Sequence, residues 1–493
     1  MAPRPLLIVT LAAAVALPLA TVQAVAAVPA PTHVVRVASN PANARIVAIE
    51  RRRGTRIVRV YRNVFPGFAA VLDARAVRRI RGYRAVRQVA PVQRVTAAAV
   101  VERRTSATGL WGLDRIDQRL PPLDGRIVTT SDGAGVNAYV VDSGIRAGQE
   151  QFGGRLLSGV SVVGDGRGTE DCGGHGTRVA GGIAGSQTGV APAMWLTPVR
   201  VIDCAGNGDS ATVIGGLDWV VASHRAGVPA VANMSLVGPR SQILNDAVAA
   251  VIADGVAVTV AAGNSPIDAC TQSPASAPGA ITTGAMTQQD AVASFSAVGP
   301  CLDIYAPGYS VLTTATTPTR RGTNQVVLAS GTSMASAFAA GAVGLGLSLA
   351  PGLTPRQVAQ GITDSATGGA LSGVPPATPN LLLYVGNGAL PLPVAARPAT
   401  PRVLSGLTAR FTFRRPMGTP AGRFRLAGVT GLPGMLTVTR AGRLLSRRYV
   451  QAGSFAFRTR LARPMTVLRV QLRPDDVERT PASALVRVTV RRP

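Results

Sequence analysis

Short apolar runs alternate with longer stretches of helical spacing through the middle of the chain. The stretches Thr212–Ser223 and Ser241–Asp254 have the length and composition of helices. Four runs rich in Val, Ile and Ala are expected to be strands: Val136–Val141, Leu196–Ile202, Ala230–Met234 and Val256–Ala262. Strands that alternate with helices are typical of a parallel sheet covered by helices. The pattern therefore predicts an α/β fold with a doubly wound parallel sheet.

One stretch of this region, Ala335–Leu349, is apolar on every side and rich in Ala and Gly. A helix of this kind is either buried in a large core or crosses a membrane. Its small residues, among them Gly341, Gly344 and Gly346, favour the buried position. We therefore expect a core helix.

A smaller α+β domain is expected before the middle region, at residues 30–104. His33–Val37 and Ala44–Ile49 are rich in Val and Ile, as strands are. Asp73–Arg81 instead has helical spacing of small and apolar residues. The Arg-rich Val101–Thr105 has the composition of an exposed linker that closes this domain.

The end of the chain has a third kind of pattern. Residues 389–401 are rich in proline and are expected to be a linker. Residues 402–493 contain five short alternating runs: Thr408–Phe413, Met435–Thr439, Ser454–Thr459, Met465–Gln471 and Leu485–Val490. Regular short strands with turns between them predict a small β-rich, sandwich-like domain.

Residues 1–26 have the features of a secretion signal. Arg4 gives a positive start, Leu6–Ala20 an apolar stretch, and Ala24-Val25-Ala26 a cleavage site of small residues. A membrane anchor is the alternative, but the apolar run is short and is interrupted by Pro18. We therefore expect an extracellular protein.

Four cysteines, Cys172, Cys204, Cys270 and Cys301, lie in the middle region. In an oxidising compartment an even number favours two disulfides, and four cysteines allow three pairings. No CxxC pair or cluster of His and Cys indicates a metal site instead. Sequential pairing, Cys172–Cys204 and Cys270–Cys301, is the simplest expectation.

The net charge of +27 is distributed unevenly, and all 51 basic residues are arginines. Residues 30–105 carry 17 Arg against 3 acidic residues, and residues 401–493 carry 19 against 3. Residues 106–385 carry 13 Arg against 18 acidic residues, so the middle is mildly acidic. A basic tail indicates affinity for polyanions or anionic surfaces. Arginine without lysine is equally explained by a composition-biased genome.

Nucleophilic catalysis by serine needs a base and a carboxylate that orients the base. His175 lies in a glycine-rich stretch before an apolar run, whereas His33 lies in the small domain and His224 in a helix-like surface stretch. Asp142 follows an apolar strand, where the active sites of open α/β sheets form. Ser333 precedes the expected core helix, whose N-terminal N–H groups suit a developing oxyanion.

A further polar residue, Asn264, follows another strand, and its amide is a candidate second donor to an oxyanion. Singly these are weak signals, because an Asp after a strand is usually in a turn and a Ser before a helix is usually its N-cap. The order Asp142, His175, Asn264, Ser333 is a far stronger signal when taken together.

Five motifs in this order resemble those of the subtilisin-like serine peptidases, in particular the proteinase K and aqualysin branch. They are Val140–Ile145, Gly174–Thr177, Asn233–Leu236, Ala261–Asn264 and Gly331–Ala335, and the resemblance covers residues 106–388. It implies that Ser333 attacks the scissile carbonyl, that His175 relays the proton and that Asp142 holds the imidazole. Asn264 and the backbone N–H of Ser333 would form the oxyanion hole.

The same resemblance implies a substrate cleft with defined walls. The walls of the pocket for the side chain before the cut would be Ser235, Leu236, Val237 and Gly238 on one side and Ala261, Ala262 and Gly263 on the other. Gly206, Asn207 and Gly208 would form the opposing edge of the cleft. A substrate would pair there as an added strand.

Two further features follow from the resemblance. The branch has the pattern Cys172–Cys204 and Cys270–Cys301, which agrees with sequential pairing. A structural calcium site would use the carbonyls of Pro278 and Ala280 with the carboxylate of Asp303, since a hard cation prefers oxygen ligands. The alternative is a solvated Asp303 in an ordinary turn. No cofactor is required for the chemistry itself.

The chain departs from the family pattern at three places. Arg178 replaces a histidine, Ser336-Ala337-Phe338 replaces Thr-Pro-His, and Val237 stands where glycine is usual. The first two are expected to alter helix packing beneath the site, and the third to narrow the cleft. No triad position is changed.

The segment Tyr61–Ala70 resembles the pro-peptides of these peptidases, which act as folding chaperones and temporary inhibitors. Self-cleavage near residues 100–106 would then leave Trp111–Ile116 near the mature start. The sequence thus predicts a secreted, self-processing serine endopeptidase of broad specificity that prefers apolar or aromatic residues before the cut.

Two alternatives concern the whole chain and its tail. The chain could instead be a catalytically degenerate member of the same fold that serves as a binding or structural protein. The tail is expected either to bind polyanions or the cell surface, or to be a stability or secretion appendage. No specific nucleic acid partner is expected.

Overall fold

The computed structural model describes residues 30–98, 110–316 and 326–386 with their side chains. It also describes the backbone of further strands: Val101–Arg103 (β6), Arg410–Arg414 (β21), Arg423–Thr430 (β22), Gly434–Arg440 (β23), Arg443–Val450 (β24), Gly453–Arg460 (β25), Met465–Pro474 (β26) and Ala482–Thr489 (β27). The predicted signal at 1–26 and linker at 389–401 lie outside the described residues.

The centre of the structure is a sheet in the order β19-β20-β16-β15-β13-β11-β7-β9-β8. Its strands are β7 (Asn137–Asp142), β8 (Val160–Ser161), β9 (Trp195–Arg200), β11 (Ala230–Met234), β13 (Ala257–Ala261), β15 (Ile281–Met286), β16 (Ile304–Pro307), β19 (Thr367–Gly368) and β20 (Leu381–Leu382). Every neighbouring pair is parallel except β19 and β20. The predicted doubly wound parallel sheet is confirmed.

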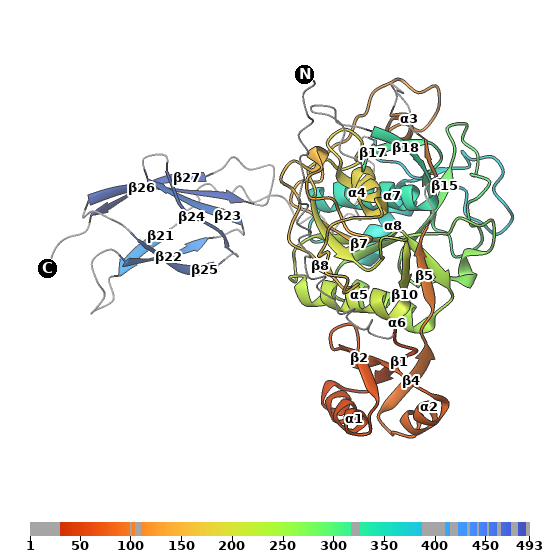
Figure 1. Ribbon diagram of the computed structural model, residues 1–493. Coiled ribbons are helices and arrows are strands. Elements are labelled where there is room, and N and C mark those ends of the chain that lie inside the picture. The colour runs from red at the N-terminus through yellow and green to blue at the C-terminus, as the bar shows by residue number, and fades with distance from the viewer. Residues whose placement is uncertain are drawn as a thin grey trace, which may run out of the picture. The chain divides into compact units, whose positions relative to one another are not determined.

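Helices cover both faces of this sheet (Figure 1), as the alternation along β7 shows. Ala138 and Val140 belong to the core shared with α4 (His175–Ala184), α7 (Thr332–Leu349) and α8 (Pro355–Ser365). Tyr139 and Val141 belong to the core shared with α5 (Ser210–Ser223) and α6 (Gln242–Ala253). Successive side chains of a strand point to opposite faces, so a strand buried on both reads as a continuous apolar run.

The helix α7 is the predicted core helix. Its length and composition would suit a membrane span, but 89% of it is buried inside the protein. A methyl group added at Gly344 would lie 2.1 Å from the sulfur of Met194, and one at Gly341 would lie 2.5 Å from Val190. The glycines therefore allow close packing of α7 against its neighbours.

Short elements complete the central region. They are α3 (Trp111–Ile116), the 3-10 helices η1 (Glu150–Phe152) and η2 (Ala269–Thr271), and the strands β10 (Asn207–Asp209), β12 (Leu236–Pro239), β14 (Gln272–Ser273), β17 (Val311–Thr314) and β18 (Val326–Ser330).

The N-terminal segment, residues 30–91, is an antiparallel sheet in the order β2-β3-β1-β4 with two helices. Its elements are β1 (His33–Val37), α1 (Asn40–Arg52), β2 (Arg56–Tyr61), β3 (Gly67–Val71), α2 (Ala74–Arg81) and β4 (Val86–Pro91). The predicted strand Ala44–Ile49 is wrong, because these residues lie within α1. The side chain of Ser39 caps this helix, and Asn43, Ile46, Val47 and Glu50 are buried at helical spacing.

The two faces of this small sheet have different neighbours. Val35 and Phe68 pack against α1 and α2. Val34, Tyr61 and Phe65 belong to the core of α5 and α6, and Figure 1 shows these helices between the small sheet and the central one. The N-terminal segment is thus docked on α5 and α6.

A strand after this segment, β5 (Arg94–Ala97), leaves it and enters the central region. It pairs antiparallel with both β10 and β12 in a sheet of order β10-β5-β12-β14. The strand β6 then pairs with β18, so the prediction of an exposed linker at Val101–Thr105 is wrong for Val101–Arg103. Backbone pairing with a neighbouring strand overrides the local preference of an Arg-rich run for solvent.

The tail forms two antiparallel sheets, β21-β22-β25 and β24-β23-β26-β27. All five predicted strands are present, together with β22 and β24. The packing of these two sheets into a sandwich stays a prediction.

Candidate active site

The structure brings together the carboxylate and the imidazole of the predicted triad. Asp142 is the last residue of β7, at the carboxyl edge of the sheet. His175 is the first residue of α4, which begins at the same edge. The Nδ1 of His175 donates a hydrogen bond of 2.7 Å to Oδ1 of Asp142, since a carboxylate only accepts. Asp142 is fully buried. The pair therefore has the geometry in which a carboxylate fixes the tautomer of an imidazole.

The hydroxyl of Ser333 completes the arrangement. Ser333 is the second residue of α7, and its Oγ lies 3.1 Å from Nε2 of His175. Its side chain is fully buried. The unprotonated Nε2 of a neutral imidazole is an acceptor to which the hydroxyl proton can pass, so the three groups form a path for proton transfer from serine.

The pKa of His175 is raised above its ordinary value. Burial acts to lower the pKa, but the charge of Asp142 and its hydrogen bond outweigh that effect. The carbonyl of Ala98, 3.0 Å from Nε2, and the charge of Asp171 also raise the pKa. Each of these groups stabilises the protonated form of His175.

The carbonyl of Ala98 lies between His175 and Ser333. The Ser333 hydroxyl donates to this oxygen at 2.9 Å, and the N–H of Ala98 donates to the carbonyl of Ser235 at 3.1 Å. The N–H of Ala97 donates to the carbonyl of Gly206 at 3.2 Å. The residue that follows β5 therefore presents a peptide carbonyl to the Ser333 hydroxyl.

The predicted cleft walls pair with β5. On one edge Gly208 lies opposite Val95, with Asn207 opposite Thr96. On the other edge Val237 also lies opposite Thr96, with Leu236 opposite Ala97. A methyl group on Gly238 would lie 2.6 Å from the carbonyl oxygen of Arg94. Val237, a departure from the family pattern, is thus in a strand that contacts the bound segment.

The side chain of Asn264 is held in place by Thr332. Its Oδ1 accepts hydrogen bonds of 2.7 Å from both the N–H and the hydroxyl of Thr332. That hydroxyl in turn accepts from the N–H of Gly263 at 3.2 Å. With the oxygen fixed, the orientation of the amide nitrogen is fixed as well, beside the residue that precedes Ser333.

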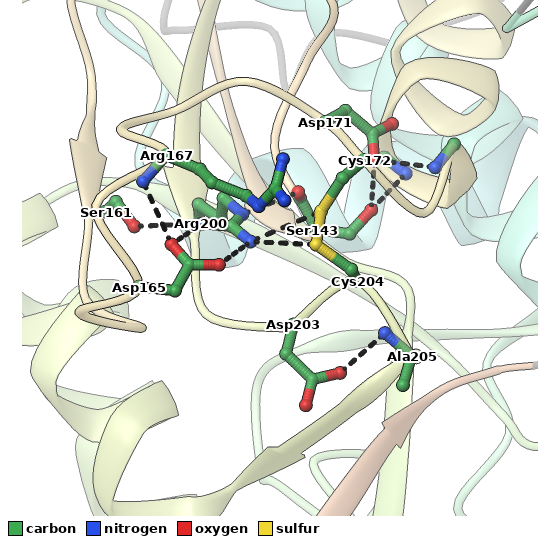
Figure 2. Close-up of a disulfide and its surroundings, with 12 residues drawn as sticks. Ser143, Ser161, Asp165, Arg167, Asp171, Cys172, Arg200, Asp203, Cys204 and Ala205 are labelled. Atoms are coloured by element: carbon green, nitrogen blue, oxygen red, sulfur yellow. Dashed lines mark hydrogen bonds and ion pairs between the residues drawn. A yellow bond between two sulfur atoms is a disulfide. The ribbon is translucent and has the colours of Figure 1, made fainter. Parts of the chain in front are cut away.

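A buried carboxylate that sequence reasoning missed, Asp171, holds the start of α4. Its Oδ1 accepts from the N–H of Gly174 at 2.7 Å and from the Ser143 hydroxyl at 2.9 Å. Its Oδ2 accepts from the N–H and the hydroxyl of Thr177 at 2.8 and 2.6 Å. Figure 2 shows Asp171 and Ser143 beside the disulfide. An Asp four residues before the candidate base was the available signal.

Both predicted disulfides are confirmed: Cys172 is bonded to Cys204, and Cys270 to Cys301. The first joins the loop before His175 to the loop that leads into β10. Arg200, fully buried at the end of β9, lies against it, with Nη2 3.4 Å from the sulfur of Cys172 (Figure 2).

The guanidinium of Arg200 connects this disulfide to the residue after Asp142. It forms two hydrogen bonds of 2.6 Å with Asp165, which hold the pKa of that carboxyl at about 2. Its Nε donates to the carbonyl of Ser143 at 3.1 Å. The cation thus fastens the Ser143 backbone to the loop that carries Asp165.

The remaining departures from the family pattern are the buried Ser336, Ala337 and Phe338 and the half-buried Arg178. Phe338 is fully buried, and a methyl group on Gly112 would lie 3.1 Å from its ring. The Ser336 hydroxyl donates to Oδ1 of Asn233 at 2.7 Å. The carbonyl of Arg178 accepts from the Thr313 hydroxyl at 2.5 Å. The contact of Ser336 is thus made by the substituted side chain, whereas that of Arg178 is made by its backbone.

Neither of the other histidines is near the site. His224 caps the end of α5, where its Nδ1 donates to Asp254 at 2.7 Å. His33 begins β1, and its pKa is lowered by burial and by the charge of Arg81.

The predicted calcium ligands lie beside β15. Asp303 is half-buried rather than solvated, and it accepts a hydrogen bond of 2.7 Å from the N–H of Thr282. Burial raises its pKa to about 6, although this hydrogen bond acts to lower it. Within the described residues no group of three or more His, Cys, Asp or Glu is arranged to hold a metal ion. Most ligands of such a site would thus have to be backbone carbonyls.

Comparisons with known proteins find similar serine proteinases. An extracellular serine proteinase of Thermus sp. (strain Rt41A) is 46% identical over 331 residues, which are 67% of this chain and 78% of the relative. Subtilisin-like serine protease AsES of Sarocladium strictum is 38% identical over 66% of this chain and 82% of the relative. The crystal structure of a cold-adapted subtilisin-like serine proteinase is 42% identical, with a TM-score of 0.53, and covers 57% of this chain and 100% of that one.

The model of the subtilase family matches residues 133–388, which contain Asp142, His175, Asn264 and Ser333. The match spans more than half of the chain and includes the whole central sheet. This chain therefore belongs to the subtilase family of serine peptidases.

Proposed function

We propose that this protein is a secreted, self-processing serine endopeptidase that uses Ser333, His175 and Asp142. One observation carries the proposal. A peptide carbonyl, that of Ala98, lies within hydrogen-bond distance of both the Ser333 hydroxyl and Nε2 of His175. The site thus combines a nucleophile, a base and a bound peptide.

The reaction follows from these positions. His175 accepts the Ser333 proton as the oxygen attacks the carbonyl carbon, and the imidazolium then donates this proton to the leaving amine. Water hydrolyses the acyl-enzyme by the same route in reverse. Asp142 keeps Nδ1 protonated and stabilises the imidazolium throughout.

The oxyanion is assigned to two donors. They are the amide nitrogen of Asn264, whose oxygen Thr332 fixes, and the backbone N–H of Ser333 at the start of α7. Donors that are oriented before the reaction stabilise the charge without reorganisation. The N-terminal end of α7 adds its dipole.

Residues 30–104 are proposed to be a pro-domain that inhibits the enzyme within the same chain. The carboxylate of Asp218 on α5 accepts hydrogen bonds from the N–H groups of Arg62, Asn63 and Val64, and the Tyr61 hydroxyl donates to the carbonyl of Ala211 at 3.0 Å. These contacts support the docking that keeps β5 in the cleft. The carbonyl at Ser333 favours cleavage after Ala98, so the released pro-domain would end at residue 98 rather than 104, just before the predicted range of 100–106.

The peptidase domain is proposed to span residues 106–388, with Trp111–Ile116 near the mature start. Its specificity is proposed to be broad, because β10 and β12 bind β5 mainly through backbone groups. The pocket walls at Leu236 and Ala261–Ala262 are apolar and favour apolar residues before the cut.

Replacement of the nucleophile tests the proposal. Ser333→Ala should abolish hydrolysis of casein and leave an unprocessed precursor, as seen by intact mass and N-terminal sequencing. A buried serine away from the site, Ser365→Ala, should still mature. A Ser333→Ala chain that matures unaided would overturn the assignment. A fluorophosphonate that fails to label the wild-type mature protein would favour the degenerate alternative.

A calcium ion is proposed at the carboxylate of Asp303 with the carbonyls of Pro278 and Ala280. The donor set fits a hard cation, since all three ligands are oxygens. Among the described residues the one hydrogen bond to this carboxylate comes from Thr282. The ion would hold the loop before β15 against the loop before β16 and would supply stability rather than chemistry.

The tail, residues 402–493, is proposed to bind polyanions or the cell surface after secretion. Its 19 arginines against 3 acidic residues support this role. Retention of the full-length Ser333→Ala chain on heparin, compared with a chain ending at residue 388, tests it. Retention that does not depend on the tail or that salt does not weaken would overturn it.

A further inference from the structure

Gln272 lies between the two walls of the pocket for the residue before the cut. It is the first residue of β14, and it pairs with Pro239 of β12, the strand that forms the first wall. Its side chain reaches Gly263, which belongs to the second wall. A methyl group added to Gly263 would lie 2.5 Å from Oε1 and 2.9 Å from Nε2 of Gln272.

The amide of Gln272 is therefore packed directly against the α-carbon of Gly263. The residue is 8% exposed. Its Nε2 has no hydrogen-bond partner among the residues that the structure describes. A buried amide N–H without an acceptor is unfavourable, by about 1–3 kcal/mol. Hydrogen bonding of this nitrogen thus does not explain the place of the side chain.

The residue just before the bond to be cut, Ala98, has a small side chain. Ala98 presents its carbonyl to Ser333, and it is 1% exposed. On the first wall Val237 adds two methyl groups where relatives usually have none. Ala98 therefore carries only a methyl group next to the reacting carbonyl, whereas Val237 lies opposite Thr96, two residues earlier in the bound segment.

We propose that Gln272 fills the depth of this pocket, so that the enzyme selects alanine-sized side chains before the cut. The inference rests on the proposed peptidase function and narrows its apolar preference to small residues. An aromatic side chain entering the pocket would have to displace the amide from Gly263 or move a wall. Close-packed interiors resist such displacement.

Two chromogenic tetrapeptides that differ only in alanine or phenylalanine before the cut test this inference on the mature enzyme. The wild type should have the higher kcat/KM for the alanine peptide. Gln272→Ala should raise kcat/KM for the phenylalanine peptide at least about tenfold, which is the discrimination that a difference in side-chain size in a pocket usually gives. It should change kcat/KM for the alanine peptide little. Gln272→Asn, which is one methylene shorter, should give an intermediate ratio and serves if the alanine variant does not mature.

Gln272→Leu keeps the volume and removes the amide, so it should keep the alanine preference. Gln360→Ala, an exposed glutamine on α8, is the matched control and should behave as the wild type. A wild type that prefers phenylalanine, or a ratio that Gln272→Ala leaves unchanged, would overturn the inference while casein hydrolysis still supports the peptidase. Loss of all Ser333-dependent hydrolysis in the wild type would overturn both.

Discussion

The hydroxyl of Ser143 donates a hydrogen bond of 2.9 Å to Oδ1 of Asp171 and accepts one of 2.9 Å from the N–H of Gly176. Ser143 follows Asp142, and Gly176 follows His175. This contact therefore joins the end of β7 to the start of α4, and Asp171 is the charged group at its centre.

Asp171→Asn should lower kcat between about tenfold and a hundredfold with little change in KM, because His175 loses part of its alignment. It should also move the acid limb of the profile of kcat/KM to lower pH. Removing a negative charge disfavours the imidazolium, so the pKa of His175 falls. Stopped assays between pH 5 and 9 measure both effects.

The matched control is Ser143→Ala, which removes the two hydrogen bonds of the Ser143 hydroxyl but keeps the charge of Asp171. It should lower kcat without moving the acid limb. Other titratable groups also face α4, and both variants leave them unchanged. They are Tyr139 and Asp142 on β7, Arg200 on β9 and Glu150 on η1, together with Arg178 on α4 itself. The described parts of α7 and β17, which also pack against α4, carry no titratable group. An acid limb that stays in place in Asp171→Asn would show that this carboxylate acts only on structure.

Asn264→Ala should lower kcat by about 10²- to 10³-fold and leave KM nearly unchanged. This magnitude is that of the corresponding donor in a subtilisin, and we carry it over to this chain. The interaction is made in the transition state, so substrate binding is largely spared. Thr332→Val, which keeps the backbone N–H but removes the hydroxyl that also bonds Oδ1, should have a smaller effect in the same direction. An Asn264→Ala enzyme with normal kcat would contradict the assignment.

The two disulfides close loops of nearly equal length, with sequence separations of 32 and 31 residues. Cys172→Ala/Cys204→Ala and Cys270→Ala/Cys301→Ala should each lower the free energy of unfolding by about 3–4 kcal/mol, the value expected for such loops. Denaturant unfolding of the Ser333→Ala precursor measures this without self-digestion.

The two double variants should differ in activity. The Cys172–Cys204 bond joins the loop before His175 to the edge strand β10 and contacts Arg200, so its loss should lower kcat/KM at temperatures where the fold is intact. Equal kcat/KM in both variants would show that the first disulfide contributes stability alone.

Calcium should raise the melting temperature of the Ser333→Ala precursor, and chelation should lower it. When the calcium concentration is a hundredfold above its dissociation constant, a bound ion raises the free energy of unfolding by about 2.7 kcal/mol. Asp303→Asn should abolish the response, whereas Asp364→Asn, a carboxylate on α8, should keep it. Asp303→Asn protein that calcium still stabilises to the same extent would place the ion elsewhere.

Local pattern was sufficient for the central elements. The strands β7, β9, β11 and β13 are short, mostly apolar runs, and the helix α7 is a long one. Such runs are typical of elements that are buried on both sides. The local pattern gave the wrong prediction at Ala44–Ile49, because Ile and Val occur in strands and helices alike. There the cap at Ser39 and burial at Ile46 and Val47 decided for α1.

The sequence by itself determined the order of the candidate reactive residues, because Asp142, His175, Asn264 and Ser333 lie in motifs that resemble, in the same order, those of the subtilisin-like peptidases. Asp171, Arg200 and Gln272 became visible only in the tertiary structure. The contacts of Asp171 with Ser143 and of Arg200 with Asp165 join residues 28 and 35 positions apart. Gln272 and Gly263 are close in sequence, but only the fold shows that they touch. The position of Ala98 at Ser333 also depended on folding, since pairing of β5 with β10 and β12 brings them together. A side chain's chemistry is local, but its partners are set by packing.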